Sequence, residues 1–374
     1  MHVVLFFTFD YSLTLWNETK ILQREEIYYK KLVENFEDLH ITFITYGDEE
    51  DYNFFQDLER VDILPIYDHI KYSKSKIIRF VKSFYFPYII KKNTKNVDII
   101  KQFQLYGSWV SILYKKLINK PLIIRTGYDM YKFSINENKS LFKQYLYKQL
   151  TRFSLKNSNL YTVTTNQDQS FLNTNFKNNN LVVRPNWTIS KNIRPITDRH
   201  KTKVLSVGRL EKQKNFSELI QVFENSEFEI DIYGEGSERK KLEMFAKNLN
   251  SKVNFLGLLD YETLQKTYED YIFFVTTSKF EGNPKTILEA QSAGCIVIAL
   301  DEQNTNELIE NGVSGIIVKN SSEILTTIKN LQYNEEKLNL ISLASASSKN
   351  VKNELNTLVK KDYKDFLTLL NKNY

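Results

Sequence analysis

Short apolar segments alternate with helix-like segments along the whole of this 374-residue chain. Residues 2–9 form a continuous apolar run, residues 18–36 place apolar side chains at helical spacing, and residues 40–47 are again strand-like. Further strand-like runs lie at 97–103, 121–129, 160–166 and 180–186. Because a parallel strand buried on both faces reads as a nearly continuous apolar run, this alternation predicts βαβ units around a parallel sheet.

A polar, proline-containing stretch at 186–202 interrupts the pattern, and a second alternation follows it. Its predicted strands lie at 203–210, 228–236, 253–259, 271–277, 295–301 and 314–319. Its predicted helices lie at 215–226, 237–250, 261–270, 284–294, 303–311 and 321–332. The chain is too long for one ordinary core, so we expect two doubly wound α/β domains that bind a ligand at the carboxyl ends of their strands.

The composition fits a globular protein of a reducing compartment. Hydrophobic residues make up 42% of the chain, and Cys295 is its one cysteine, which excludes an internal disulfide framework and a multi-cysteine metal site. The first apolar run has no basic leader, so we interpret it as a buried strand and not as a signal peptide. No run reaches the roughly 18 apolar residues of a spanning helix. These features predict a cytoplasmic protein that is soluble or peripheral to a membrane.

A basic loop follows the predicted strand at 203–210. Gly208 permits a sharp turn or a close backbone approach, Arg209 offers a planar fork of donors, and Lys214 offers a point charge. This combination suits a diphosphate at the carboxyl end of a strand. A solvated basic loop before a helix would look the same, and the loop alone does not separate the two interpretations.

The stretch 280–299 places two carboxylates around a predicted helix start. Asn283 can cap the helix and Pro284 fits its first turn, where free backbone N–H groups favour a phosphate. Glu289 lies among apolar neighbours, where a carboxylate is costly without a partner, and it could accept hydrogen bonds from the hydroxyls of a ribose. Glu281, outside the cap, could bind a second sugar. Alternatively, Glu281 is a helix-dipole partner and Glu289 a surface residue.

Taken together, these features describe a site for a nucleotide-sugar, and residues 203–320 resemble the donor-binding half of a known enzyme family. The matching segments are VGRLEKQKNFSELI (207–220), IYGEGSERKKLE (232–243), residues 253–299 and NGVSGIIV (311–318), in the family's order and spacing. This half is similar to the retaining glycosyltransferases of family 4, also described as glycosyl transferases group 1, which have the GT-B fold.

The resemblance implies an α/β architecture of two facing Rossmann-like, doubly wound domains with an inter-domain cleft. Residues 1–188 would bind the acceptor and residues 189–353 the nucleotide-sugar donor. The amphipathic segment 354–374 would be a helix that returns to the N-terminal domain.

The resemblance also implies roles for single residues. Arg209, Lys214 and Glu281 would be catalytic, because the first two hold the donor diphosphate and the third contacts the transferred sugar. Glu289 would bind the ribose, and the backbone near Leu258 would contact the nucleobase. The sugar–phosphate pocket would be lined by backbone groups of Gly208, Gly282, Asn283 and Lys285.

Several glycines and acids in the chain have a less specific interpretation. Gly234 and Gly236 are more typical of turns and close packing. We expect no metal and no cofactor, since Arg, Lys and a helix N-terminus already offset the charge of the leaving group. The acidic run 49–51 is interpreted as a solvated loop.

The predicted activity is the transfer of a sugar, with retention, from a UDP- or GDP-sugar to a glycan or lipid-linked glycan acceptor in cell-envelope polysaccharide synthesis. One alternative is a nucleotide-sugar epimerase or hydrolase on the same fold, but the scarcity of histidines argues against it. Another is a non-catalytic nucleotide-binding or RNA-binding scaffold. Release of UDP or GDP that depends on a glycan acceptor would favour a transferase, and strong salt-sensitive RNA binding without nucleotide-sugar binding would favour the scaffold.

The N-terminal half departs from the family. It has no glycine-rich loop after the first strand, and at 123–130 it carries Arg125, Tyr128 and Asp129 where relatives often have a histidine near the sugar. Arg125 either replaces that histidine or is a structural ion-pair partner. Tyr128 and Asp129 are weak candidates for contacts with the acceptor.

Two segments of this half are basic, aromatic and free of acidic residues. Residues 69–97 hold eight Lys or Arg, and residues 139–160 hold five. An anionic membrane surface, a nucleic acid and an ordinary core helix with a basic outer face are the competing interpretations. A nucleotide-sugar site in the same chain favours the membrane, and no nucleic-acid partner is predicted. We therefore expect a peripheral protein at the inner face of the plasma membrane.

Overall fold

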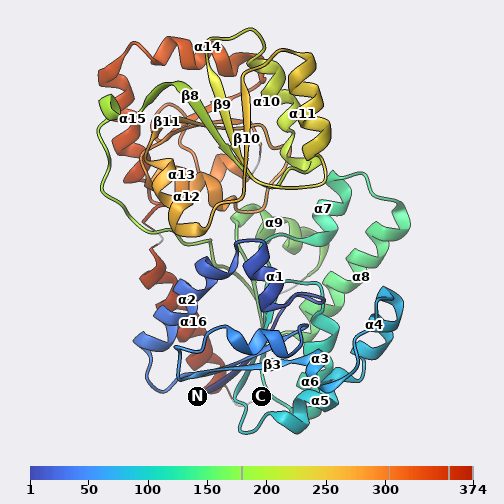
Figure 1. Cartoon of the computed structure of the whole chain (residues 1–374). Helices are drawn as coiled ribbons and strands as arrows, with labels where there is room; N and C mark the ends of the chain where they lie inside the picture. Colours follow the sequence, from blue (N-terminus) through green and yellow to red (C-terminus); the bar gives the residue numbers. More distant parts are fainter. Residues whose placement is uncertain (178–179, 303, 353, 373–374) are drawn as a thin grey trace. The chain divides into compact units, whose positions relative to one another are not determined.

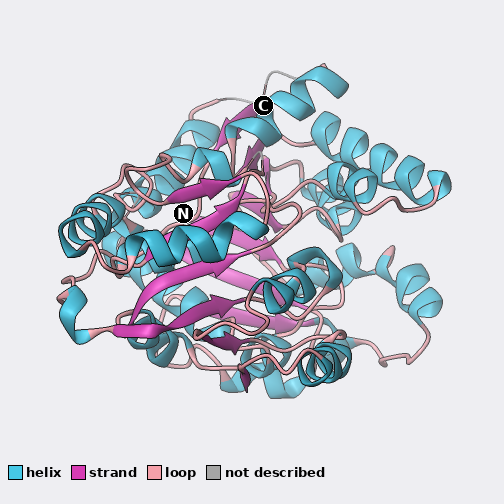
Figure 2. Cartoon of the chain, turned by 90° about the horizontal axis from the view of Figure 1, so that it is seen from above, coloured by secondary structure: helices cyan, strands magenta, loops and turns pink. Residues whose placement is uncertain are grey.

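The computed structural model describes residues 1–177, 180–302, 304–352 and 354–372, and these fold into two compact units (Figure 1). Unit 1 consists of Met1–Pro185 and Asn356–Tyr374, and unit 2 of Asn186–Leu355. The boundary predicted after residue 188 falls within three residues of the observed one. In both units the strand layers lie between helices (Figure 2).

Unit 1 is built on a seven-stranded parallel sheet in the order β3-β2-β1-β4-β5-β6-β7. Its strands are β1 (His2–Phe6), β2 (His40–Thr45), β3 (Val61–Pro65), β4 (Ile99–Phe103), β5 (Leu122–Arg125), β6 (Leu160–Val163) and β7 (Leu181–Val183). Its helices are α1 (Leu13–Glu18), α2 (Leu22–Asn35), α3 (Ile66–His69), α4 (Lys76–Ser83), α5 (Phe86–Asn93), α6 (Ser108–Ile118), α7 (Met130–Asn136), α8 (Leu141–Asn157), α9 (Asn166–Asn175) and most of α16 (Leu355–Leu370). The order of the strands reverses between β1 and β4, so the loops after these two strands form the switch point where α/β sheets bind ligands.

Unit 2 is built on a six-stranded parallel sheet in the order β10-β9-β8-β11-β12-β13. Its strands are β8 (His200–Val207), β9 (Glu229–Tyr233), β10 (Val253–Gly257), β11 (Tyr271–Thr276), β12 (Ile296–Leu300) and β13 (Ile316–Val318). Its helices are α10 (Phe216–Val222), α11 (Arg239–Asn248), α12 (Tyr261–Tyr268), α13 (Lys285–Ser292), α14 (Ser322–Leu331) and α15 (Glu335–Ala346). Here the strand order reverses between β8 and β11.

The sheet of unit 2 is buried on both faces, which explains its continuous apolar strands. On β8, Val204 packs into one hydrophobic cluster and its neighbour Leu205 into another. Phe273 and Phe274 of β11 divide between the same two clusters. Since successive side chains of a strand point to opposite faces, consecutive residues of β11 each meet an apolar cluster, and the strand is a run of consecutive apolar residues.

Four sequence-based expectations are corrected by the structure. The helix predicted at 18–36 begins later, as α2 at Leu22, because the chain breaks at Lys20, whose φ is 59°, and Glu18 ends the separate helix α1. The helix predicted at 303–311 is a short 3₁₀ turn at Thr305–Glu307, with residue 303 outside the described residues. Strand β3 was not predicted, because its five residues are few and Asp62 interrupts its apolar pattern. The acidic run 49–51 is not simply solvated, since Asp51 is buried and accepts hydrogen bonds from the backbone and hydroxyl of Thr14 at 3.0 and 3.1 Å.

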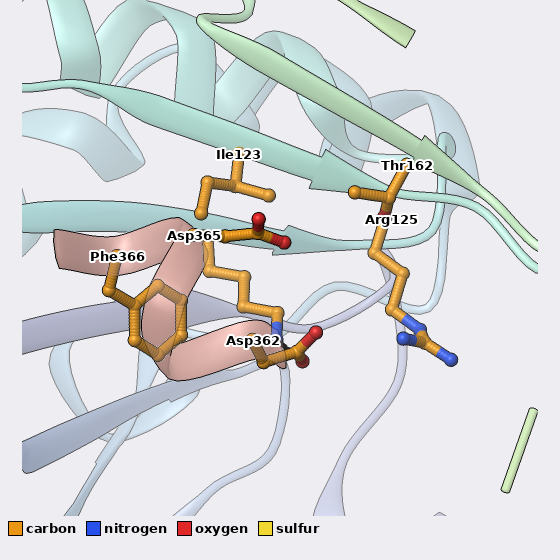
Figure 3. Close-up of a pocket in the computed structure, with 7 residues that line it drawn as sticks. Ile123, Arg125, Thr162, Asp362, Asp365 and Phe366 are labelled. Carbon is orange, nitrogen blue, oxygen red and sulfur yellow. Dashed lines mark hydrogen bonds and ion pairs between the residues drawn. The ribbon is translucent and has the colours of Figure 1, made fainter. Parts of the chain in front are cut away.

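Helix α16 is fixed on unit 1 by buried polar contacts as well as by apolar packing. Asp362 accepts hydrogen bonds from Lys101 Nζ of β4, at 2.8 Å, and from the Tyr28 hydroxyl of α2. Figure 3 shows Asp362 and Phe366 of α16 against strand β5, in a small cavity that Arg125 and Thr162 also line. Burial raises the pKa of Asp362, but the charges of Lys101 and Arg125 outweigh it and hold the pKa below its usual value.

Candidate functional site

The loops that follow β8 and β11 meet at the switch point of unit 2. The Thr277 hydroxyl, just after β11, donates a hydrogen bond of 3.0 Å to the carbonyl of Asn215 in the loop after β8. Gln213 of the same loop donates from Nε2 to the carbonyl of Phe280 at 2.9 Å. The basic loop and the stretch that begins at Phe280 therefore form one site, although Gln213 and Phe280 are 67 positions apart in the sequence.

Two glycines let neighbouring backbone segments approach the loop after β8. Gly234, which follows β9, has a φ of +149°, and a Cβ built on it would lie 1.9 Å from the carbonyl oxygen of Gly208. A Cβ on Gly236 would lie 2.4 Å from the carbonyl oxygen of Leu210. Any side chain at these positions would push the β9 loop away from Gly208, so both are packing glycines, as the sequence indicated.

Lys214 and Glu281 form the central ion pair of the site. Lys214 Nζ lies 2.5 Å from Glu281 Oε1, and both side chains are largely buried. Gln213 Nε2 lies 3.5 Å from the other carboxylate oxygen. The sequence had assigned the two residues to different parts of a ligand, a diphosphate and a sugar. The structure places their charged groups in direct contact.

The helix start at α13 differs in detail from the prediction. Pro284 is the N-cap residue, with no side-chain cap, and the helix begins at Lys285. Asn283 does not cap it. Its Oδ1 accepts a hydrogen bond from the backbone N–H of Asn186 at 3.2 Å, and its carbonyl accepts one from Asn186 Nδ2 at 2.7 Å. Asn283 thus fixes the loop that leads into α13, and the first backbone N–H groups of the helix keep no side-chain acceptor at the N-cap.

Glu289 is a buried carboxylate in the middle of α13. It is 4% exposed, and the Tyr268 hydroxyl of α12 lies 3.4 Å from its Oε2. Burial, and next the negative charge of Glu289, raise the pKa of Tyr268 well above its usual value, so this hydroxyl stays a donor. The interpretation of Glu289 as a surface residue is wrong, because its neighbours Leu288 and Ala290 belong to a hydrophobic cluster.

Arg209 and Leu258 are the exposed members of the predicted set. Arg209 follows β8, and among the residues that the structure describes its side chain has no hydrogen bond or ion pair. Leu258 follows Gly257, whose φ is +74°, at the end of β10. Both are therefore accessible to a ligand, whereas Lys214, Glu281 and Glu289 are held by internal contacts.

Sequence reasoning missed Asn304 as a member of this site. Its Nδ2 donates a hydrogen bond of 2.6 Å to the carbonyl of Glu281, and it is completely buried. The helix expected at 303–311 did not indicate this contact, because it placed Asn304 in the first turn of a helix and not in a loop that reaches residue 281. A polar DEQNTN run directly after β12 was the available signal, since polar residues after a parallel strand face the ligand edge.

The three acceptor-side candidates lie in unit 1 and differ in environment. Asp129 is buried and caps α7, accepting from the Lys132 N–H at 2.8 Å and the Thr151 hydroxyl at 3.1 Å. Burial raises its pKa to about 6. Tyr128 is exposed and packs on Phe133. Arg125, at the end of β5, contributes positive charge to the buried Asp362. This electrostatic interaction favours a structural role for Arg125, and Asp129 has one as a helix cap.

Neither a metal site nor a spanning helix was found in the described part of the chain. Within residues 1–177, 180–302, 304–352 and 354–372 no three His, Cys, Asp or Glu side chains are grouped so that they could hold a metal ion. Over the same residues, every helix is too short or too polar to cross a bilayer.

Residues 190–346 match the family model described as glycosyl transferases group 1, and they cover the whole site described above. These residues form a glycosyl transferases group 1 domain. The domain boundaries of the match agree with unit 2, which contains both the basic loop and α13.

Curated relatives support this assignment. The GtfA subunit of a UDP-N-acetylglucosamine–peptide N-acetylglucosaminyltransferase from Streptococcus agalactiae is 34% identical over 32% of this chain and 25% of its own length. The chain thus matches about a quarter of the length of that relative. An uncharacterized glycosyltransferase from Haemophilus influenzae is 24% identical over 75% of this chain and 78% of its own length.

The solved structures show the fold of the whole chain. Sucrose-phosphate synthase from Thermosynechococcus elongatus superposes with a TM-score of 0.82 at 15% identity, and the match covers 99% of both chains. The glycosyl transferases group 1 domain and the preceding unit are therefore the two Rossmann-like domains of the GT-B fold.

Proposed function

We propose that this chain transfers a sugar from a nucleotide-sugar donor to a glycan or lipid-linked glycan acceptor, with retention at the anomeric carbon. The observation that carries the proposal is the contact between Lys214 of the basic loop and Glu281, which lies shortly before the start of α13 at the switch point of unit 2. Arg209 is exposed in the same basic loop. Relatives named as transferases of UDP-N-acetylglucosamine support a UDP-sugar donor, and a GDP-sugar is the alternative that the experiment includes.

Charge stabilisation of the leaving group is the chemistry that the site can supply. The exposed guanidinium of Arg209 and the first N–H groups of α13 would bind the diphosphate, and Lys214 would share its charge between Glu281 and the phosphates. Negative charge grows on the diphosphate as the bond to the sugar loosens, so these donors stabilise the transition state more than the ground state. We propose that the reaction needs no metal ion, since the cationic groups and the helix N-terminus take that role.

The two carboxylates would accept hydrogen bonds from hydroxyl groups on either side of the diphosphate. Glu289, held near the Tyr268 hydroxyl, would accept hydrogen bonds from the ribose. Glu281 would contact the transferred sugar while paired with Lys214. The backbone of Gly208, Gly282, Asn283 and Lys285 would line the sugar–phosphate pocket, and that of Leu258 the nucleobase site.

We also propose that the chain works as a peripheral protein at the cytoplasmic face of the plasma membrane, in cell-envelope polysaccharide synthesis. Support comes from the two basic segments of unit 1, 69–97 and 139–160, which contain thirteen Lys or Arg between them and no acidic residue. Such segments are attracted to anionic lipids. A lipid-linked acceptor would then be presented at the surface where the enzyme sits.

The test starts with a thermal-shift screen of the purified chain against UDP-, GDP- and ADP-sugars, followed by nucleotide release with glycan acceptors. We expect Glu289→Ala to weaken donor binding about tenfold, the loss of roughly one hydrogen bond to a charged group. Arg209→Ala should chiefly lower kcat, by about a hundredfold. Lys212→Ala, in the same exposed loop, is the matched control and should change neither value. NMR of the product tests retention, and added EDTA tests metal independence.

Several outcomes would contradict the proposal. If Arg209→Ala and Glu289→Ala both kept the parental affinity and rate, the site assignment would be lost. Nucleotide release that is equally fast without acceptor would point to a hydrolase. Salt-sensitive RNA binding without any nucleotide-sugar binding would point to a scaffold.

A further inference from the structure

Helix α4 turns its apolar side away from its own unit. Ile77 is 76% exposed and Val81 64%, and Ile78 and Phe80 are exposed as well, whereas Arg79 is only 6% exposed. An ordinary surface helix buries the apolar face and solvates the charge. Because α4 does the reverse, its outward side is suited to a partner that accepts apolar side chains.

Polar contacts on the inner side fix this orientation. Arg79 Nε and Nη2 bind the two carboxylate oxygens of Asp10 at 2.9 and 2.8 Å, and Nη1 binds the carbonyl of Ser73 at 2.8 Å. The indole N–H of Trp109 in α6 donates to the hydroxyl of Ser83 at 2.8 Å. A bidentate, buried guanidinium–carboxylate pair is costly to break with one partner left behind, so α4 cannot rotate its isoleucines inward at low cost.

The Arg79–Asp10 pair also changes the interpretation of 69–97 as a segment whose basic residues all face a membrane surface. Arg79 is not available to a surface, and its charge is compensated within the unit. Asp10 lies in the loop after β1, which belongs to the switch point of unit 1. The outward-facing helix is therefore attached to the loop where a ligand of this unit is expected.

A second group of exposed apolar side chains lies on α8, which packs on the same central helix. Ser108 of α6 and Ser154 of α8 share a hydrogen bond of 2.7 Å, while Trp109 of α6 contacts α4. The first turns of α8 expose Leu141, at 82%, and Phe142 and Tyr145. The name apolar ridge is used below for the exposed apolar side chains at α4 alone, which are Ile77, Ile78, Val81 and Phe84.

The charges around the apolar ridge indicate which kind of partner would bind to it. Lys71, Lys74 and Lys76 are exposed directly before or at the start of α4, and neither 69–97 nor 139–160 contains an acidic residue. A second copy of the chain, docked through the same face, would set lysines against lysines. A nucleic acid would match the charge but leave the isoleucines in water. An anionic bilayer offers headgroups for the lysines and acyl chains for the ridge.

We propose that the apolar ridge inserts into the interface of an anionic bilayer, with α4 held in place by the Arg79–Asp10 pair. This goes further than the surface contact in the proposed function, on which it rests, because it predicts penetration by named side chains. Electrostatic adsorption through lysines alone would leave Ile77 and Val81 in water.

Penetration can be measured with an environment-sensitive fluorophore on the full-length chain. Ile77→Cys carries the NBD label, Cys295 is buried and does not compete, and Lys247→Cys on α11 of unit 2 is the matched exposed control. Vesicles of phosphatidylcholine with about one-third phosphatidylglycerol are the probe. We expect a blue shift and protection from aqueous quenchers at position 77, and neither at position 247. Vesicle binding without a shift at position 77 would overturn the proposal.

Two further variants separate insertion from adsorption. Ile77→Asn/Val81→Asn keeps the net charge and should lower vesicle partitioning at least about tenfold, whereas the parent should keep part of its binding at roughly 0.5 M salt, where surface attraction is screened. Lys74→Gln/Lys76→Gln should bind less at low salt and show the parental blue shift once bound. Equal sedimentation of Ile77→Asn/Val81→Asn and the parent, with unchanged melting temperatures, would contradict the proposal.

The same preparations keep this inference separate from the proposed function. We expect UDP binding and nucleotide release by unit 2 to be unaffected by substitutions at position 77, which lies in unit 1. Turnover by a protein that does not insert would contradict only the proposed membrane insertion. Insertion without any nucleotide-sugar turnover would contradict only the proposed function.

Discussion

The ammonium group of Lys214 lies 2.5 Å from Oε1 of Glu281, and the two residues come from loops after different strands of one sheet. The pair brings together the two ends of the proposed donor site, the basic loop after β8 and the stretch before α13. Since Lys214 already has an anionic partner, a bound diphosphate would be a second anion beside the same ammonium. In the proposed function the pair would hold Lys214 in position for a diphosphate. The charge of Glu281 would repel UDP, which carries no sugar for Glu281 to contact.

We predict that Glu281→Gln binds UDP more tightly and turns over more slowly. Removing the negative charge beside Lys214 should raise UDP affinity roughly fivefold, about 1 kcal/mol at the effective dielectric of a partly buried site. Loss of the contact to the sugar should lower kcat about a hundredfold. Calorimetry with UDP and steady-state kinetics measure the two effects. Glu211→Gln, whose carboxylate binds Ser237 in a neighbouring turn, is the control, and weaker UDP binding by Glu281→Gln would contradict the prediction.

A methyl group at Gly234 should damage the site far more than one at Gly312. Both glycines have positive φ, but the Cβ of Gly234→Ala would lie 1.9 Å from the Gly208 carbonyl, whereas that of Gly312→Ala would meet nothing within 4 Å. Backbone strain alone costs about 1 kcal/mol, and the overlap at Gly234 should bring the cost above roughly 3 kcal/mol. Chemical denaturation compares the two, and similar losses of stability would show that the close approach to Gly208 is unimportant.

Removal of Lys101 should destabilise the packing of α16 on unit 1. The side chains of Lys101 and Asp362 are each 6% exposed, so Lys101→Met leaves a buried carboxylate without its closest cation, at a cost of about 3–5 kcal/mol. Lys101→Met/Asp362→Leu should recover most of this loss. The exposed pair Lys266–Glu262 supplies the control Lys266→Met, with an effect below about 1 kcal/mol. A double variant as unstable as Lys101→Met would contradict this account.

Asp129, the buried N-cap residue of α7, should make a contribution to the free energy of unfolding that decreases as pH rises. Its pKa is raised to about 6 in the folded chain from an ordinary value of 3.8, so between these values the folded state binds the proton that the unfolded state releases. This contribution is fully present below the pKa of the unfolded state and is lost as pH rises to about 6. It amounts to at most about 3 kcal/mol. Asp129→Asn keeps an oxygen for the cap and should flatten this part of the profile.

Denaturation of the parent and Asp129→Asn between pH 4 and 7 measures the difference. Other acids titrate in both proteins, so only the gap between the two curves reports on position 129. We expect Asn at this position to gain stability relative to Asp as pH rises through 6. A constant gap would show that Asp129 keeps an ordinary pKa.

Motifs that depend on local chemistry could be predicted from the sequence. The continuous apolar runs at β11 and β12 predicted strands buried on both faces, because consecutive side chains of a strand point to opposite faces and both must be covered. The basic residues after β8 and the carboxylate inside α13 predicted a ligand edge. Gly234 and Gly236 were correctly interpreted as packing glycines, since the structure brings the backbone of residues 208 and 210 against them.

Details that depend on distant partners could not be predicted. Asn283 has the composition of a helix cap, but its oxygen is used by Asn186, 97 residues away in the sequence. Asn304 reaches Glu281 from a segment expected to be helical. In 69–97 the eight cationic residues looked alike, and only packing shows that Arg79 is buried against Asp10.

By itself, the sequence determined the alternation of strands and helices, the two-domain organisation and the residue types at the ligand edge, because periodicity and local turn chemistry depend on neighbours in the chain. The tertiary structure decided which charges are free and which are paired. It placed Lys214 against Glu281, Arg79 against Asp10 and the isoleucines of α4 in solvent. A charge or an apolar side chain acquires its role from the groups that surround it in space, and those groups come from remote positions that the order of residues does not reveal.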